Sequence, residues 1–244
     1  CSNMSCICLQ VLKLHPLADP ASRLPFIETT LSTLRKEIDG TGTTLLGFVG
    51  TPWTLAAYSI EGKADKDCKE TKVQTTCWCS SMCAHIIQLF DSWAHHLSPQ
   101  QFVEFSLPYA DRLAAALKAK YPQVPVIFHA NGGTGKLETM KATSADVIGL
   151  DWATDIKTAR NTLGEGVRVQ GNLDPMILFG PEEKIVEATN QLLLAAGPHG
   201  HILNVGHGVI QGTPEAAVGV FCEAARRSGS LFAKSGSDQP LVGV

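Results

Sequence analysis

Residues 147–163, VIGLDWATDIKTARNTL, decide the fold class. The apolar run at residues 147–150 lacks polar alternation, which predicts a strand covered on both faces, as in a parallel sheet. An aspartate and a tryptophan follow it directly, and residues 155–163 are then expected to form a short helix. A strand, a polar cluster and a helix therefore succeed one another within this one stretch.

The same order recurs along the chain. Strands are predicted at residues 45–49, 86–90, 124–128, 147–150, 167–170 and 201–205. Helices are predicted at residues 98–120, 134–141, 155–163, 181–196 and 213–227. This alternation predicts an α/β fold with a parallel sheet and right-handed crossovers.

Two α/β architectures fit such a pattern, a closed barrel and an open, doubly wound sheet. The open sheet predicts a dinucleotide fingerprint after its first strand, and residues 47–52, GFVGTP, do not have the G-x-G-x-x-G spacing. We therefore expect a (β/α)8 barrel of the TIM type that is incomplete, with about six of its eight units present and the first units missing.

Length and composition limit the classes of protein. The 244 residues predict one domain, which we assign to residues 11–228. Residues 1–10 and 64–83 differ in composition from their surroundings, and residues 229–244 are expected to be a loose tail. Because the chain begins at Cys1 rather than Met, we expect a fragment or a processed product.

The charge pattern argues against nucleic acid and membrane partners. The formal net charge is -3, with 18% charged and 44% hydrophobic residues, and no basic stretch offers a footprint for nucleic acid or an anionic membrane. No apolar run approaches the roughly 20 residues of a membrane span.

Two motifs that suggest bound ligands fail in their details. The segment GGTGK at residues 132–136 lacks the first glycine and the final Ser or Thr of a phosphate-binding loop, so a glycine-rich turn is expected. Cys77, Cys79, Cys83 and His85 do not have a standard zinc spacing. We expect neither a metal site nor structural disulfides among the eight cysteines.

Polar residues follow the predicted strands at one register, where a barrel places its active site. They are Thr51, Pro52 and Trp53; Asp91, Ser92 and Trp93; His129 and Asn131; Asp151 and Trp152; Gly171, Asn172 and Asp174; and Gly206, His207 and Gly208. Asp151 and Asp174 could instead be helix caps, and the three tryptophans could serve packing alone.

His207 is the strongest candidate from the residues alone. Its neighbours Gly206 and Gly208 let the backbone approach a ligand, and an imidazole can donate to a carboxylate near neutral pH. Tyr58 and Ser92 are neutral hydrogen-bonding groups that could join it.

Taken together, these clusters resemble the uroporphyrinogen decarboxylase family, in the form found in photosynthetic eukaryotes. The segments that carry the resemblance are residues 47–62 (GFVGTPWTLAAYSIEG), 90–93 (FDSW), 149–152 (GLDW), 170–175 (QGNLDP) and 204–208 (NVGHG). The resemblance covers about residues 11–63 and 84–228.

The resemblance implies a single-domain barrel that forms homodimers with facing clefts. It implies conversion of the four acetate side chains of uroporphyrinogen III to methyl groups, giving coproporphyrinogen III for haem and chlorophyll, without a metal or organic cofactor. By motif, Tyr58, Ser92 and His207 match the substrate-contacting positions. It further implies the plastid stroma as the location, with the cytoplasm as the alternative.

The sequence departs from the family in two places. The arginine-containing segment and the aspartate that binds the pyrrole nitrogens would lie before the region corresponding to Val11, and the family has a longer helical insert where residues 64–83 stand. We therefore expect the chain as written to have little or no decarboxylase activity and assign no catalytic residue within it.

Two other functions remain as alternatives. A zinc-dependent corrinoid methyltransferase needs thiolate and imidazole ligands at the strand ends, but His129-Ala130-Asn131 offers Asn where a cysteine ligand is expected. A non-catalytic remnant that only binds tetrapyrrole is compatible with the missing anchors.

Overall fold

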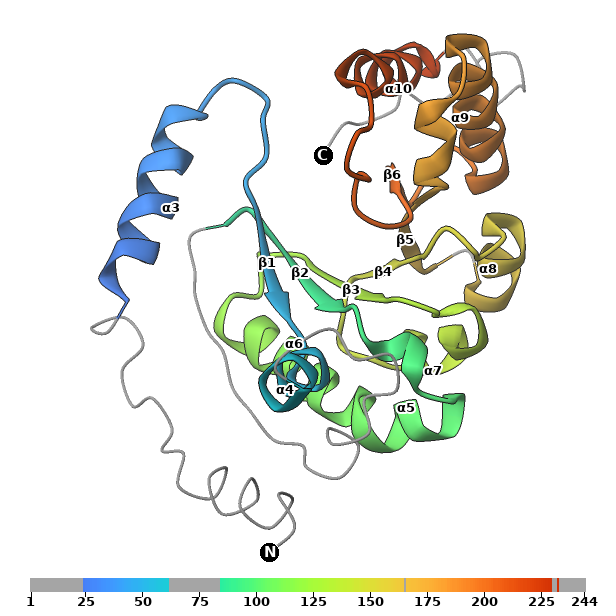
Figure 1. Cartoon of the computed structure of the whole chain (residues 1–244). Helices are drawn as coiled ribbons and strands as arrows, with labels where there is room; N and C mark the ends of the chain where they lie inside the picture. Colours follow the sequence, from blue (N-terminus) through green and yellow to red (C-terminus); the bar gives the residue numbers. More distant parts are fainter. Residues whose placement is uncertain (1–23, 62–83, 165, 230–231, 233–244) are drawn as a thin grey trace, which may run out of the picture. The chain divides into compact units, whose positions relative to one another are not determined.

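The computed structural model of the chain describes residues 24–61, 84–164, 166–229 and 232 (Figure 1). Six strands form one sheet in the order of the chain. They are β1 (Leu46–Gly50), β2 (Ile86–Asp91), β3 (Val126–Ala130), β4 (Val147–Gly149), β5 (Arg168–Leu173) and β6 (His201–Val205). Every predicted strand is present, and the sequential order with helices between the strands confirms the α/β class and fits a partial TIM barrel.

Neighbouring strands pair in parallel. β1 pairs with β2 from Leu46 opposite Ile86 onward, and β5 pairs with both β4 and β6 in the same direction. Because parallel strands point one way, the carboxyl ends within each of these pairs lie at the same edge. The polar clusters seen in the sequence follow those ends.

Helices follow the strands along the chain, and some of them begin at a capping side chain. The α-helices are α3 (Pro25–Glu37), α4 (Pro52–Glu61), α5 (Pro99–Phe105), α6 (Leu107–Lys120), α7 (Leu137–Lys141), α8 (Ile156–Leu163), α9 (Glu182–Ala196) and α10 (Glu215–Arg227). Short 3-10 helices are η2 (Ala94–His96), η3 (Thr134–Lys136) and η4 (Pro175–Phe179). At α8, the Asp155 side chain accepts a hydrogen bond from the Thr158 backbone N–H at 2.7 Å, so this aspartate is an N-cap.

The single helix predicted at residues 98–120 is two helices in the structure. Ser98 opens α5 with a capping box that includes Gln101. Ser106 ends α5, and Pro108 then lies in the first turn of α6, where its missing N–H costs no helical hydrogen bond. The prediction missed this break because the apolar spacing continues across it.

The described residues form two compact units, and the division falls within β3. In the first unit the largest fully buried side chains include Trp53, Phe102 and Phe128, and Phe102 stacks on Phe128 with ring centroids 6.3 Å apart. Full burial of an apolar side chain of this size contributes about 2–3 kcal/mol.

The second unit has its own apolar core between β5, η4, α9 and α10. Leu173, Leu178, Ile185 and Ala217 form its buried centre. Figure 1 shows α9 and α10 packed side by side. The expectation of one domain over residues 11–228 remains a prediction.

Some predictions fall beyond the described residues. Residues 1–10 and 64–83 lie outside them, as does the tail apart from Gly229 and Phe232. Among the helices that the structure describes, none combines the length and the apolar character needed to cross a bilayer.

Candidate functional site at the strand ends

Tyr58 and Ser92 lie in the first unit and His207 lies in the second. That these three side chains form one site remains a prediction from the sequence. The part in the first unit and the part in the second unit are each held by contacts among residues of that unit.

A buried aspartate holds together the part of the candidate site that lies in the first unit. Asp91 is the last residue of β2 and is fully buried. Its carboxylate accepts a hydrogen bond from Thr54 Oγ1 at 2.8 Å and another from the Ser106 hydroxyl. Since Thr54 belongs to α4 and Ser106 lies between α5 and α6, one carboxylate joins three segments of the first unit.

The same network fixes the loop that carries Ser92. The Trp93 backbone N–H donates to Thr54 Oγ1 at 3.3 Å, and the Trp53 indole N–H donates to the Trp93 carbonyl at 3.2 Å. The Ser92 carbonyl lies 2.9 Å from Nδ1 of His95. Ser92 therefore lies between the buried Asp91 and Trp93, whose backbone N–H and carbonyl are both hydrogen-bonded.

Tyr58 reaches this loop through an aromatic contact. Its ring packs edge-to-face on Trp93, with centroids 5.3 Å apart and planes at 90°. Tyr58 remains 52% exposed, whereas Trp93 is only 8% exposed. The structure thus brings Tyr58 and Ser92 to the same loop, and the packing role considered for Trp53 and Trp93 is confirmed.

His207 follows β6 in the second part, and its side chain is exposed. The Gly208 backbone N–H donates to His207 Nδ1 at 2.7 Å. Because Nδ1 is the acceptor, the proton of the neutral ring is on Nε2. The turn therefore leaves Nε2 as a hydrogen-bond donor for a ligand.

Gly206 is required by a close backbone approach. A Cβ atom at this position would lie 2.2 Å from the Trp152 backbone nitrogen, and the Gly206 carbonyl accepts a hydrogen bond from that nitrogen at 3.1 Å. Trp152 itself is 51% exposed, and its role stays a prediction.

Asp174 and Asp151, which were both considered as helix caps, have different partners in the structure. Asp174 caps η4, because its side chain accepts from the Met176 backbone N–H at 2.8 Å. Asp151 is buried, and its carboxylate accepts from the Gly133 backbone N–H at 2.9 Å and from Thr154 Oγ1 at 2.6 Å. The cap hypothesis is therefore confirmed for Asp174 and wrong for Asp151.

His129 lies in β3 within the second unit and is buried. Burial lowers the pKa of His129 because water no longer solvates the charged ring, and the nearby Asp151 carboxylate partly opposes that effect. The ring packs against Gly149, where a Cβ atom would lie 2.8 Å from the His129 Cβ.

Of the two failed motifs, only the glycine-rich one lies wholly within the described residues. Residues 132–136 form a turn and the short helix η3, and the buried Lys136 ammonium donates to the Gly132 carbonyl at 2.7 Å. Cys77, Cys79 and Cys83 lie outside the described residues. Within the part of the chain that the structure describes, no three His, Cys, Asp or Glu side chains are grouped to hold a metal ion.

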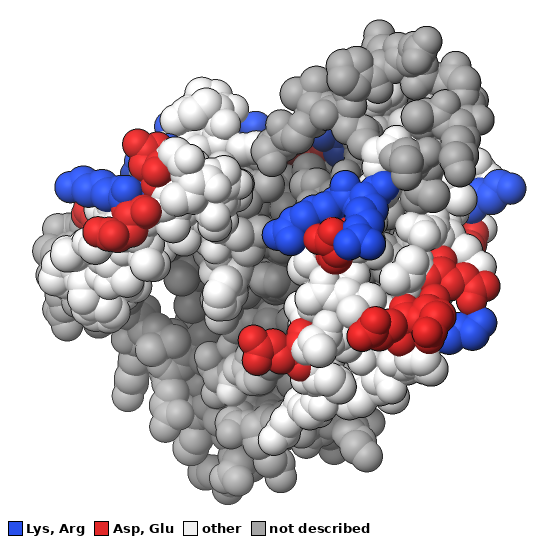
Figure 2. Space-filling view, turned by 90° about the horizontal axis from the view of Figure 1, so that it is seen from above, with Lys and Arg blue, Asp and Glu red and all other residues white. Residues whose placement is uncertain are grey.

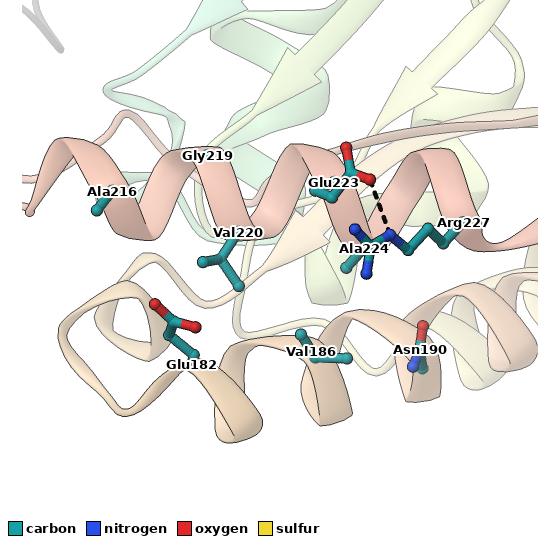
Figure 3. Close-up of a pocket in the computed structure, with 9 residues that line it drawn as sticks. All are labelled: Glu182, Val186, Asn190, Ala216, Gly219, Val220, Glu223, Ala224 and Arg227. Atoms are coloured by element: carbon teal, nitrogen blue, oxygen red, sulfur yellow. Dashed lines mark hydrogen bonds and ion pairs between the residues drawn. The ribbon is translucent and has the colours of Figure 1, made fainter.

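A groove of about 610 Å³ lies between α9 and α10 (Figure 3). Val186 and Val220 line it from the two helices, and Glu223 accepts a hydrogen bond from Arg227 at 2.8 Å near one end. None of the three predicted contact residues lines this groove.

Charges on the face seen in Figure 2 are of both signs, with Lys and Arg beside Asp and Glu. The ion pair of Lys184 with Glu187, at 2.6 Å within α9, is exposed. Exposed pairs contribute less than about 1 kcal/mol each.

The family model described as "Uroporphyrinogen decarboxylase (URO-D)" matches residues 8–77 and 73–228. The two matches meet inside the stretch 64–83 that differs in composition. A uroporphyrinogen decarboxylase from Synechocystis sp. is 43% identical over 91% of this chain and 69% of its own length. One from Trichodesmium erythraeum is 41% identical over 92% of this chain and 69% of its own length.

Among solved structures, a methyltransferase from Methanosarcina mazei matches with a TM-score of 0.65 and 19% sequence identity. It covers 86% of this chain and 66% of its own chain, and at this identity the match supports the fold alone. The family match and the cyanobacterial relatives show the family as well as the fold. On these grounds the chain belongs to the uroporphyrinogen decarboxylase family.

Proposed function

We propose that this chain belongs to a protein that decarboxylates the four acetate side chains of uroporphyrinogen III to give coproporphyrinogen III. The observation that carries the proposal is the 43% identity, over 91% of the chain, to a relative named uroporphyrinogen decarboxylase. The parallel strand ends that bear the polar clusters support it, because barrels place their chemistry there.

The reaction sets clear demands on the site. Protonation of a pyrrole carbon makes the ring an electron sink, and the bond between the acetate methylene and its carboxylate then breaks. Carbon dioxide leaves, the methylene carbon takes up a proton to become a methyl group, and the first proton leaves the ring. The protein must supply and accept protons, stabilise a cationic ring and bind several carboxylates.

Tyr58, Ser92 and His207 suit the last of these demands. A tyrosine hydroxyl, a serine hydroxyl and an imidazole Nε2–H are donors that can bind carboxylates. The loop anchored by Asp91 supports the first two, and the hydrogen bond from the Gly208 N–H to His207 Nδ1 supports the third. We assign these side chains to substrate binding, and no proton-transfer step to any of them.

Turnover needs more than these residues. The family resemblance implies that an aspartate for the pyrrole nitrogens and a set of arginines belong to the barrel, in the region before residue 11. The relatives are longer, since the chain spans 67–69% of their lengths. We propose that a polypeptide of residues 1–244 alone binds tetrapyrrole with little or no decarboxylation.

An assay with the purified polypeptide tests both statements. Uroporphyrinogen III is incubated with it without oxygen, and the products are oxidised and separated by chromatography. Binding of uroporphyrin III is measured in parallel by fluorescence. Binding without coproporphyrinogen is expected, and near-normal coproporphyrinogen formation would refute the proposed loss of activity.

Matched variants test the assigned contacts. Tyr58→Phe and His207→Ala should each weaken uroporphyrin binding about tenfold, because each removes a hydrogen bond to a carboxylate. Tyr109→Phe and His199→Ala make the same chemical changes elsewhere and should leave binding unchanged. Equal effects of the paired variants would contradict the assignment.

We also propose a homodimer in the plastid stroma. The cyanobacterial origin of the relatives supports the location, and the family resemblance supports the dimer. Sedimentation equilibrium tests the dimer, and the location of the protein in a photosynthetic cell tests the compartment. A monomer across the concentration range, or a cytoplasmic signal alone, would contradict the respective proposal.

A further inference from the structure

We propose that Asn172 is a positioning residue that sets the direction of the His207 imidazole without touching the ligand itself. The inference rests on the proposed function, in which the His207 imidazole binds a substrate carboxylate. It is carried by a continuous chain of hydrogen bonds within the second unit.

The Asn172 side chain holds the turn that leaves β4. Asn172 lies in β5 and is only 5% exposed. Its amide nitrogen donates to the Asp151 carbonyl at 2.7 Å and to the Thr154 carbonyl at 2.5 Å. Both protons of one amide are therefore used to fix two backbone carbonyls of residues 151–154.

The same turn is held from its other side by a carboxylate. Asp151 accepts from the Gly133 backbone N–H at 2.9 Å and from Thr154 Oγ1 at 2.6 Å. Thr154 Oγ1 in turn lies 2.8 Å from Thr134 Oγ1. With the carbonyls fixed by Asn172 and the carboxylate fixed by its donors, residues 151–154 have little freedom to shift.

This turn meets the turn of His207 directly. The Trp152 backbone N–H donates to the Gly206 carbonyl at 3.1 Å, and the Gly206 backbone N–H donates to the Leu173 carbonyl at 2.7 Å. Gly206 is thus fixed between β5 and the Asp151 turn, at a spacing that leaves no room for a Cβ atom. Any displacement of the Asp151 turn moves the residue that precedes His207.

Replacement of Asn172 by Asp tests the inference with almost no change of shape. The variant replaces the donor by an oxygen that faces two carbonyls, so the turn must move away from it. We expect Asn172→Asp to weaken uroporphyrin III binding by about tenfold, the effect of losing about one hydrogen bond to a carboxylate. Asn172→Ser, which keeps one donor, should recover part of the affinity and covers the case in which the first variant does not fold.

The His207→Ala background separates positioning from a structural role. If Asn172 acts through His207, its replacement should weaken binding in the wild-type background and have little further effect in the His207→Ala background. An equal loss in both backgrounds would overturn the inference. If His207→Ala alone leaves binding unchanged, the proposed contact fails instead, and the two failures are distinguishable.

The His207 ring supplies a readout independent of binding. Nitrogen NMR of the wild-type chain should show the neutral ring protonated at Nε2, as the Gly208 N–H to Nδ1 bond requires. Asn172→Asp should shift the ring toward a mixture of the two tautomers, whereas Asn161→Asp, the same change on the surface of α8, should not. An unchanged tautomer in the folded Asn172→Asp variant would refute the positioning role.

Discussion

Removal of the Asp91 carboxylate should destabilise the first unit far more than its small volume suggests. Asp91 is fully buried and accepts hydrogen bonds from the Thr54 and Ser106 hydroxyls. In Asp91→Ala both hydroxyls lose their acceptor inside the core. Asp91→Asn keeps the shape and one acceptor oxygen, and its new N–H can donate to the Ser106 oxygen.

The magnitude follows from the two orphaned donors. A buried polar group left without a partner costs about 1–3 kcal/mol, so two of them cost roughly 2–6 kcal/mol. The carboxylate no longer has to be desolvated, which offsets part of this cost. We therefore expect about 3 kcal/mol for Asp91→Ala and about 1 kcal/mol for Asp91→Asn.

Thermal unfolding measures the difference. In a chain of this length about 1 kcal/mol shifts Tm by about 2–4 °C, so Asp91→Ala should lower Tm by about 6–12 °C and Asp91→Asn by about 2–4 °C. The buried Trp53 and Trp93 beside the network supply a fluorescence signal. Asp39→Ala, on the surface, is the control and should leave Tm unchanged.

Two results would refute this reasoning. If Asp91→Ala unfolds at the wild-type temperature, the hydroxyls find other acceptors and the network does not hold the loop. If Asp91→Asn is as destabilising as Asp91→Ala, the charge rather than the acceptor geometry carries the stability. Thr54→Val, which removes one donor and leaves the carboxylate, should fall between the two Asp91 variants.

Three further predictions concern the rest of the fold. Burial lowers the pKa of His129 and of His201 below the ordinary 6.5, so the unfolded chain binds these protons first. The free energy of unfolding should therefore be constant well above pH 6.5 and fall as the pH drops through 6.5, by up to about 1.4 kcal/mol per pH unit for each ring, as measured by urea titrations. Arg160→Lys should cost about 2 kcal/mol in the same titrations, because the guanidinium donates to three backbone carbonyls that one ammonium cannot reach together. Gly149→Ala should cost about 1–3 kcal/mol because its Cβ meets His129, whereas Gly219→Ala, with nothing within 4 Å, should stabilise α10 by about 0.5–1 kcal/mol.

Each of these has its own control. The pH slope should become shallower in His129→Asn, and an unchanged slope there and in His201→Asn would exclude these rings as its origin. Arg112→Lys, on the exposed face of α6, should be neutral, and a comparable loss would point to a general effect of the substitution. Equal effects of alanine at the two glycine positions would contradict the packing argument.

The strands could be predicted because their signal is local. Five of the six predicted strands contain runs of Val, Ile, Leu or Phe, and β6 has the predicted bounds at His201–Val205. Their order in the sheet follows from the strand and helix alternation, since right-handed crossovers place each strand beside its predecessor. The helix starts at Ser98 and Asp155 could also be predicted from the sequence, because a cap and its partner lie three residues apart.

The contacts of the supporting residues could not be predicted because their partners are distant in the chain. Thr54 and Asp91 are separated by 37 positions, and Asn172 and Asp151 by 21. No spacing rule links such pairs, and for Asp151 the sequence suggested a place in the active-site cluster or a helix cap, neither of which names its partners. Ser92 and His207 stand just after predicted strand ends, so the pattern places them, whereas Tyr58 lies within α4 and was singled out through the family motif.

The two parts of the candidate site share one physical arrangement. Asp91 and Asp151 are both buried at a strand end, and each accepts a hydrogen bond from a threonine hydroxyl. Burying a carboxylate is favourable only when its donors are fixed in place, so these bonds keep the following backbone from shifting. Trp93, which comes after Asp91, packs against the Tyr58 ring, and the Trp152 backbone N–H, which comes after Asp151, donates to the Gly206 carbonyl. A side chain that must stay exposed to meet a ligand cannot be held by its own packing, and a buried anchor nearby is the means by which its direction can still be fixed.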